Sequence, residues 1–305
     1  MAKITVLIAD GMDKDSIASL KQKGFEVIDQ HFEEKELSEK VKQVNAVVVR
    51  SATKIRKPIL DAALETKQLS IVIRGGVGID NIDAEYAREK GITVKNTPAA
   101  SSASVAELAI GHMFCLARSL HHANLTMRQG KWEKKLYAGG FELAGKTLGI
   151  VGMGRIGNET AKRAMALGMR VIYIDIVDAT LPGVAKVTKD ELLAQSDFVS
   201  LHVPLDKKVG AFLKYDDLKK MKKGSYVVNC ARGGVVDEEG LLQALDEGHL
   251  AGAALDVFAQ EPTTNERLYH HDKISLTPHL GATTKEGQER VGKEVVEILC
   301  KHFKI

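Results

Sequence analysis

Short apolar runs rich in β-branched residues alternate with amphipathic stretches along almost the whole chain. The first five runs are ITVLIAD, FEVI, AVVV, IVI and ITV. Each is followed by polar or small residues and then by helix-like sequence such as DSIASLKQKG, which ends in glycine as many helices do. Strands that alternate with helices are typical of a parallel α/β sheet, so we expect a small doubly wound domain here.

The segment NTPAASSASVAELAIGHMFCLARSLHHANLTMRQG interrupts this alternation. Pro98 ends the preceding strand, and Ser101, Ser102 and Ser104 are candidate helix N-caps. Apolar residues then recur near helical spacing at Leu108, Met113, Leu116, Leu120 and Leu125. We therefore expect one long helix of about 25 residues that leads into a second domain.

A second series of six apolar runs follows, namely TLGIVG, RVIYID, FVSLHV, SYVVNC, AGAALDV and ISLTP. Six strands with intervening helices are the full complement of a dinucleotide-binding fold. The chain ends in KEGQERVGKEVVEILCKHF, whose spacing predicts an amphipathic helix that crosses back to the first domain. The predicted fold class is α/β, with two doubly wound parallel sheets.

Composition excludes several classes of function. The 305 residues are 44% hydrophobic and 27% charged, as in ordinary globular proteins. A net charge of +3, the absence of long runs of like charge and only 5% aromatic residues argue against a nucleic-acid partner. The apolar stretch in MAKITVLIAD is too short for a secretory signal, and AELAIGHMFCLA is too short for a membrane span. Isolated Cys115, Cys230 and Cys300, without a CxxC pair, favour a reducing cytoplasm and suggest no metal site.

The decapeptide LGIVGMGRIG carries the strongest chemical signal. It places Gly152, Gly154 and Gly157 directly after a strand and at the start of a helix. The first glycine permits a tight turn, the second lets the backbone approach a pyrophosphate, and the third lets helix and strand pack closely. The N–H groups at the start of the helix would face the phosphates. The alternative is that these glycines only allow tight packing.

Asp175 ends the next strand, at about the spacing of 20 residues that such folds use. Its carboxylate suits the hydroxyls of an adenosine ribose and would repel a 2′-phosphate, so we expect NAD rather than NADP. The alternative is that Asp175 only caps a loop. Residues from several other loops and strand ends complete the expected cofactor site: Val77, Arg155, Ile156, His202, Val203, Pro204, Cys230, Ala231, Gly281 and Ala282.

Three charged residues each follow one of the later apolar runs: Arg232, Glu261 and His279. Because the carboxyl ends of parallel strands meet in one crevice, we expect these side chains to converge. Hydride chemistry at a carbinol carbon needs a proton carrier and a group that grips a carboxylate, roles that suit histidine and arginine. Glu261 would orient the imidazole and raise its pKa. The alternatives are that His279 is a surface residue, that Glu261 belongs to a solvated turn and that Arg232 is only part of a loop surface.

The other histidines are not expected to take part in the reaction. No catalytic role is expected for His202, and His112, His121 and His122 are expected to be packing or surface residues.

Motifs along essentially the whole chain resemble the D-isomer-specific 2-hydroxyacid dehydrogenases, in that family's order: RGGVGIDNID, NTPAASSASVAELAIG, GKTLGIVGMGRIG, NCARGGVVDEEGL, AGAALDVFAQEP and TPHLGATT. The resemblance implies that the Arg, Glu and His above form the active site, that Asp175 binds adenosine and that Asp256 contacts the nicotinamide. It implies a Rossmann NAD-binding domain (99–282) inserted in a flavodoxin-like substrate-binding domain (1–98 and 283–305), with the active site in the cleft between them. It also implies a homodimer built partly from the long helix.

Within the family, VVVRSATK is similar to a segment of the D-3-phosphoglycerate dehydrogenases that binds the substrate's phosphate and carboxylate, here Arg50 and Ser51. Lys54 adds charge, Gly75, Gly76 and Val77 offer backbone N–H groups to an anion, and Lys134 and Lys135 are expected to reach a neighbouring subunit's cleft. The alternative for Arg50 is a surface salt bridge. Many of these enzymes carry Asn where Ser101 stands, which leaves the placement of the substrate open.

The expected reaction is NAD-dependent oxidation of 3-phospho-D-glycerate to 3-phosphooxypyruvate, the entry to serine biosynthesis. The expected form is a short one without a C-terminal regulatory domain, and hence without serine feedback through such a domain. A glyoxylate/hydroxypyruvate reductase or a broad D-2-hydroxyacid dehydrogenase is the alternative enzyme. A non-catalytic NAD-sensing corepressor is the alternative outside enzymes, and an intact Arg/Glu/His set argues against it.

Overall fold

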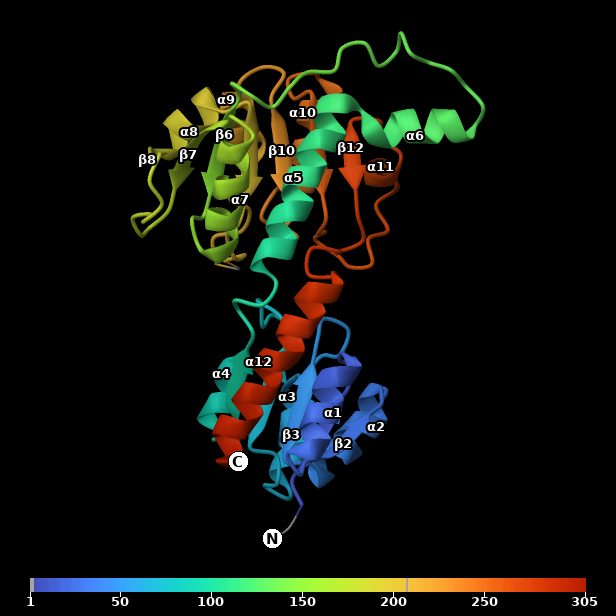
Figure 1. Ribbon diagram of the computed structural model, residues 1–305, viewed down its shortest axis with the longest axis vertical. Coiled ribbons are helices and arrows are strands. Elements are labelled where there is room, and N and C mark those ends of the chain that lie inside the picture. Colours follow the sequence, from blue (N-terminus) through green and yellow to red (C-terminus); the bar gives the residue numbers. More distant parts are fainter. Residues whose placement is uncertain (1–2, 207) are drawn as a thin grey trace. The chain divides into compact units, whose positions relative to one another are not determined.

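The structure is a computed structural model that describes residues 3–206 and 208–305, and it divides into two compact units. The first unit comprises Met1–Ser101 and Ala282–Ile305, and the second comprises Ser102–Gly281. Each is built on one parallel sheet with helices on both faces (Figure 1). The predicted fold class, two doubly wound α/β sheets, is confirmed.

The first unit contains a five-stranded parallel sheet in the order β2-β1-β3-β4-β5. Its strands match the five predicted runs: β1 (Thr5–Ile8), β2 (Glu26–Asp29), β3 (Ala46–Val49), β4 (Ile71–Arg74) and β5 (Thr93–Asn96). The helical segments are α1 (Lys14–Gln22), α2 (Glu34–Lys40), η1 (Val41–Gln43), α3 (Lys57–Leu64), α4 (Ala84–Glu89) and α12 (Lys285–Phe303). The central strand β3 is buried along its whole length, because both faces of the sheet are covered.

Helix α12 spans the residues that the sequence predicts and packs on the first sheet, as expected. Val291 and Val295 share a buried cluster with Val6 and Ile8 of β1. Gly292 makes the close approach of α12 to α1 possible, since a Cβ there would lie 1.9 Å from the Asp13 carboxylate. The C-terminal segment is therefore part of the core of the first unit.

The second unit contains a seven-stranded parallel sheet in the order β12-β11-β10-β9-β6-β7-β8. The six predicted runs form β6 (Thr147–Val151), β7 (Arg170–Ile174), β9 (Phe198–Leu201), β10 (Tyr226–Asn229), β11 (Gly252–Leu255) and β12 (Ile274–Leu276). The remaining helices are α7 (Arg155–Ala166), α8 (Lys189–Gln195), α9 (Tyr215–Lys220), α10 (Glu238–Asp246) and α11 (Glu266–Tyr269). The seventh strand, β8 (Val184–Lys186), was not predicted; it is a three-residue edge strand without a buried residue.

The prediction of one long helix after Pro98 is wrong. The chain forms α5 (Ser102–Arg118) and α6 (Leu120–Arg128), separated by Ser119 in a left-handed conformation with φ of 49°. The apolar spacing continues across the break, but α6 has no buried residue, whereas α5 is largely buried. In α6, His122 contacts the carbonyl oxygen of Asp272. Among the described residues, no helix is both long and apolar enough to span a bilayer.

Candidate active site

The glycine loop connects β6 to α7 at the carboxyl edge of the second sheet. Gly152 has φ of 93°, and a Cβ there would lie 2.7 Å from the His202 carbonyl oxygen. A Cβ on Gly157 would lie 2.1 Å from the Gly152 carbonyl oxygen, so both positions require glycine for packing. Gly154 differs, because a Cβ there would meet no atom within 4 Å. Its missing side chain leaves open space at the first turn of α7, as a phosphate approaching the helix N-terminus would need.

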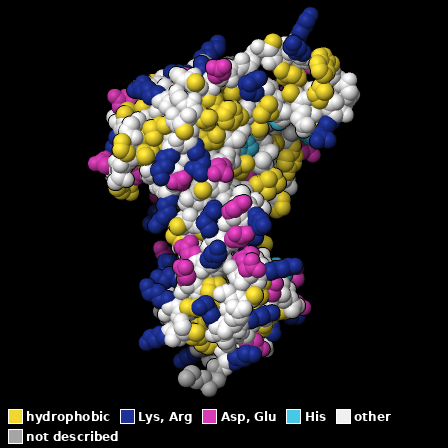
Figure 2. Space-filling view, in the orientation of Figure 1, with side chains coloured by type: hydrophobic (Ala, Val, Ile, Leu, Met, Phe, Trp, Pro, Cys, Tyr) yellow, Lys and Arg dark blue, Asp and Glu magenta, His cyan; other side chains and the backbone are white. Residues whose placement is uncertain are grey.

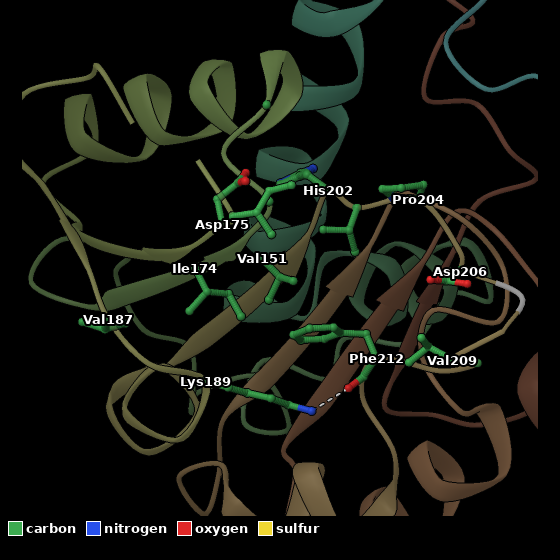
Figure 3. Close-up of a pocket in the computed structure, with 15 residues that line it drawn as sticks. Val151, Ile174, Asp175, Val187, Lys189, His202, Pro204, Asp206, Val209 and Phe212 are labelled. Atoms are coloured by element: carbon green, nitrogen blue, oxygen red, sulfur yellow. Dashed lines mark hydrogen bonds between the residues drawn. The ribbon is translucent and has the colours of Figure 1, made fainter. Parts of the chain in front are cut away.

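A pocket of about 720 Å³ opens beside this loop (Figure 3). Six of the expected cofactor residues line it: Gly152, Gly154, Asp175, His202, Val203 and Pro204. Nine lining residues were not predicted: Val151, Ile174, Ile176, Val187, Lys189, Asp206, Val209, Gly210 and Phe212. Ile174 and Ile176 flank Asp175 in sequence, and Val151 directly precedes Gly152 in the glycine motif, so their places at strand ends were usable signals. Lys189 begins α8, and the remaining five lie outside any motif. The pocket walls are mostly apolar, as expected for a site that holds a flat aromatic base.

Asp175 lies at the end of β7 and points into this pocket (Figure 3). Its Oδ2 accepts a hydrogen bond from the Met153 N–H at 2.6 Å, and its Oδ1 accepts one from the Val177 N–H at 3.0 Å. The carboxylate therefore ties the glycine loop to the next strand. Each oxygen keeps a second lone pair, so the group can still accept hydrogen bonds from ribose hydroxyls.

His202 follows β9 and lines the same pocket. Burial lowers the pKa of its imidazole to about 4, so the ring is neutral near pH 7. Nε2 lies 3.0 Å from the Ser200 Oγ, and Nδ1 is buried without a hydrogen-bond partner in the described part of the chain. A ring that stays neutral suits a wall of the cofactor groove better than a proton carrier.

His279 and Glu261 form a pair, with Nδ1 of the ring 2.7 Å from Oε2 of the carboxylate. The other carboxylate oxygen accepts a hydrogen bond from the Phe258 N–H at 3.1 Å. Burial alone would raise the pKa of Glu261, but the hydrogen bond and charge of His279, the Phe258 N–H and the charge of Arg232 together lower it. Both side chains are about one-third exposed, at 33% for His279 and 35% for Glu261, so a ligand can reach the ring.

Arg232 lies in a loop after β10 that Asn229 holds in place. The Asn229 side chain donates to the Arg232 carbonyl at 2.9 Å and accepts from the Ala231 N–H at 3.1 Å. The next residue, Gly233, packs against the Phe258 backbone so closely that a Cβ would lie 1.7 Å from the Phe258 carbonyl oxygen. This contact brings the arginine loop beside the segment that carries Glu261. The structure thus gathers all three sequence-predicted catalytic residues in the second unit.

Asp256, the expected nicotinamide contact, is 1% exposed and follows β11. Its carboxylate accepts hydrogen bonds from the Leu280 and Gly281 N–H groups at 2.7 and 2.9 Å. Cys230 is buried beside it, and burial followed by the charge of Asp256 raises the pKa of the thiol, which therefore stays protonated. A protonated thiol is no nucleophile, so Cys230 can only line the site.

The expected substrate residues of the first unit surround the end of β3. Asp10 accepts hydrogen bonds from the N–H groups of Arg50 and Thr53 at 2.6 and 3.0 Å, which fixes the Arg50 loop. Burial lowers the pKa of the Arg50 guanidinium, and the charge of Asp10 opposes this shift. Within residues 3–206 and 208–305, no carboxylate forms an ion pair with Arg50. Ser51 and Lys54 are exposed on the same loop.

The N–H groups of Gly75 and Gly76, expected to cradle an anion, donate here to the carbonyl oxygens of Val49 and Arg74 at 2.8 and 2.9 Å. Their role as an anion cradle stays a prediction. Lys134 and Lys135 are exposed in the segment after α6. Val77 and Ala282 belong to the first unit, while Arg155, Ile156, Ala231 and Gly281 lie in the second unit outside the pocket lining.

A glycine loop at a helix N-terminus, an acid at the next strand end and a His–Glu pair define the second unit as that of a dinucleotide-dependent oxidoreductase. Residues 110–281 match the family described as D-isomer specific 2-hydroxyacid dehydrogenase, NAD binding domain. The chain belongs to this family, and its cofactor is NAD.

Individual relatives differ in their named activities. The chain is 45% identical over 311 aligned positions to hydroxypyruvate reductase from Thermotoga maritima, with complete coverage of both chains. It is 42% identical over 303 positions to D-3-phosphoglycerate dehydrogenase from Methanocaldococcus jannaschii, covering 98% of this chain and 57% of that protein. The solved structure of a glyoxylate reductase from Paecilomyes thermophila superimposes with a TM-score of 0.87 at 32% identity, covering 98% of this chain and 95% of that one. The chain therefore spans little more than half of the length of the phosphoglycerate dehydrogenase relative.

Proposed function

We propose that this protein catalyses the NAD-dependent interconversion of 3-phospho-D-glycerate and 3-phosphooxypyruvate. The observation that carries this proposal is Arg50, a partly buried guanidinium without an ion-pair partner among the described residues. A desolvated charge is costly unless an opposite charge compensates it, so this site calls for an anionic group of the ligand. A 2-hydroxy acid that also carries a phosphate supplies two anions, one for Arg232 and one for Arg50.

The geometry of the second unit supports the catalytic roles that we propose. His279 takes the hydroxyl proton during oxidation and returns it during reduction. Glu261, 2.7 Å from the imidazole, stabilises the protonated ring and fixes its orientation. Arg232 holds the substrate carboxylate in a bidentate fork, since a planar guanidinium matches a planar carboxylate.

The residues of the second unit also fit the cofactor. The open space at Gly154 and the first turn of α7 would hold the pyrophosphate, and Asp175 would hold the adenosine ribose. When bound, NAD accepts or supplies the hydride. We propose that the buried carboxylate of Asp256 lies near the nicotinamide end of this site.

A hydroxypyruvate reductase is the second candidate. The Thermotoga maritima relative of that name matches the chain over its full length, unlike the phosphoglycerate dehydrogenase from Methanocaldococcus jannaschii. An unphosphorylated substrate would leave Arg50 without an anion. The two candidates therefore differ in what Arg50 does.

Steady-state kinetics of the Arg50→Ala variant separate the two candidates. If Arg50 binds a phosphate, KM for phosphohydroxypyruvate rises by about 10- to 100-fold, the equivalent of one charge-assisted hydrogen-bonded pair of 1.5–3 kcal/mol. KM for hydroxypyruvate and glyoxylate then changes little. Arg88→Ala, which removes an exposed arginine of α4, is the matched control and should change neither value. Equal effects of Arg50→Ala on phosphorylated and unphosphorylated substrates would refute the phosphate assignment, and no turnover of any substrate by the parent would favour a non-catalytic NAD sensor.

We also propose that the protein is a homodimer in the cytoplasm. Large apolar side chains are exposed on α6 and the segment after it: Leu120, Leu125, Met127, Trp132 and Leu136. Figure 2 shows hydrophobic side chains gathered over this part of the second unit, at the upper right. An apolar patch of this kind supports a protein–protein contact, and a symmetric pairing of two copies is the commonest solution. A role in serine biosynthesis rests on the proposed substrate and stays a prediction.

A further inference from the structure

Helix α5 carries a histidine whose surroundings are polar rather than apolar. His112 is 3% exposed, and its Nδ1 and Nε2 lie 3.1 and 3.0 Å from the hydroxyl oxygens of Ser275 and Thr277. Ser275 lies in β12 and Thr277 follows it, so the two side chains share one face of the strand. The ring therefore bridges α5 to the strand that leads directly into His279. The sequence predicted only a packing or surface role for this residue.

Thr277 passes this contact on to Asp256. Its hydroxyl donates to the Asp256 Oδ1 at 2.6 Å. A hydroxyl has one proton, so Thr277 must accept from the His112 Nε2–H. In the neutral ring, Nδ1 then accepts from the Ser275 hydroxyl. Burial lowers the pKa of His112, with the charge of Asp256 opposing and His121 adding to the shift, which keeps the ring neutral.

Asp256 in turn fixes the backbone at His279 and at the two residues after it. Its carboxylate accepts from the Leu280 and Gly281 N–H groups at 2.7 and 2.9 Å, and its carbonyl oxygen accepts from the His279 N–H at 2.8 Å. His279 has φ of 53°, a left-handed conformation that costs an ordinary residue about 1–2 kcal/mol. Such a conformation persists where surrounding bonds over-determine it.

We propose that His112 and Thr277 are positioning residues that act through Asp256 to hold the His279 ring in line with Glu261. The chain of hydrogen bonds links His112 of α5, Thr277 after β12 and the buried carboxylate of Asp256. None of these three residues is the proton carrier itself. This inference rests on the proposed catalytic role of His279. It adds that the buried network, rather than the His–Glu contact alone, sets the geometry of proton transfer.

The test compares Thr277→Val with Thr277→Ser. Valine keeps the shape of threonine and removes the hydroxyl, whereas serine keeps the hydroxyl and removes a methyl group. Misplacing a catalytic group by a fraction of an ångström to 1 Å can lower the rate by up to about 100-fold, so we expect Thr277→Val to lose roughly tenfold or more in kcat. Thr277→Ser should keep most of it, and the Kd for NADH should stay within about twofold in both. If Thr277 only fills space, the order of the two variants is reversed.

Two further variants, Thr147→Val and His279→Ala, make the outcome decisive. Thr147→Val makes the same change at a buried threonine at the opposite end of the sheet, where β6 begins, and should leave kcat unchanged. His279→Ala should abolish most turnover while NADH still binds; normal turnover would overturn the proposed function itself. If His279→Ala is inactive but Thr277→Val is as active as Thr277→Ser, only the positioning proposal fails.

His112→Leu tests the far end of the network. Two residues that act through the same path should show strong non-additivity, so the double variant with Thr277→Val should be little slower than Thr277→Val alone. Additive losses, or a loss of NADH affinity as large as the loss of kcat, would overturn the proposal. If Thr277→Val fails to fold, a kcat for His112→Leu that equals that of the parent would overturn it as well.

Discussion

Replacing Gly154 by alanine is expected to leave the fold intact and to weaken the binding of NADH. Gly154 is the N-cap of α7, with φ of −64°, and a Cβ there would meet no atom within 4 Å. Alanine is a poorer N-cap than glycine by up to about 1 kcal/mol. It also reduces the freedom of the unfolded chain, which stabilises by about 0.4–1 kcal/mol. These effects oppose each other, so the free energy of unfolding should change by less than about 1 kcal/mol.

The added methyl group should act on the cofactor instead. It would occupy the space through which a phosphate reaches the N–H groups of the first turn of α7. Losing a charge-assisted hydrogen bond costs about 1.5–3 kcal/mol, and each 1.4 kcal/mol is a factor of ten. The Kd for NADH should therefore rise by about 10- to 100-fold.

Titration of NADH fluorescence and a thermal melt measure the two quantities. A change below 1 kcal/mol corresponds to a shift in Tm of at most about 2–4 °C for a unit of this size. Gly157→Ala is the comparison, because its Cβ would lie 2.1 Å from the Gly152 carbonyl oxygen and the backbone must move. That variant should lose clearly more stability, as overpacked sites do. An unchanged NADH affinity in Gly154→Ala, or a melt as low as that of Gly157→Ala, would refute the reasoning.

Three other changes test different parts of the molecule. Asp175→Asn should raise the ratio of kcat/KM with NADPH to that with NADH by about tenfold, because a charge that repels the 2′-phosphate is removed; an unchanged ratio would contradict the role of Asp175. The folded-state pKa of Glu261 is lowered, so this carboxylate stabilises the fold above its usual pKa of 4.5, and the contribution is lost as pH falls through the folded value. Between pH 5 and about pH 3, the Tm of Glu261→Gln should therefore fall less than the Tm of the parent. Parallel curves of Tm against pH for the two proteins would argue against the ion pair. Leu125→Glu, at a side chain that is 53% exposed, should convert the proposed dimer to monomers in sedimentation velocity, and a monomeric parent would exclude that surface.

The central strands were predictable because their residues are buried on both faces, whereas β2, which has no buried residue, was found only from its β-branched run. AVVV of β3 is entirely buried, so an unbroken apolar run was the correct signal. The edge strand β8 has no buried residue and therefore no such pattern. The break at Ser119 left no trace in the apolar spacing, because Leu120 and Leu125 continue the periodicity although they face solvent.

The proximity of the site residues was predictable only where each residue follows a strand and the order of those strands in the sheet could be inferred. Glu261 and His279 follow the adjacent strands β11 and β12, so their proximity follows from the parallel order of the sheet. The role of His112 could not be found in this way. It lies within the buried face of α5, and only the position of that helix against β12 shows that two hydroxyl groups meet the ring. Likewise, the Gly75 and Gly76 N–H groups were assigned from a loop motif that does not show which carbonyl oxygens they meet.

The place of helix α12 in the core of the first unit has a consequence for the newborn chain. Val291, Val295 and Leu299 cover Val6 and Ile8, yet the ribosome makes them after the whole second unit, which ends at Gly281. At about 5–20 residues per second, the last part of the chain follows on the order of one to five seconds later. During that interval the sheet that was translated first lacks part of the apolar cover on one face, where only α1 and the residues after it are in place. The first unit can therefore complete its core only after the second unit has been synthesised.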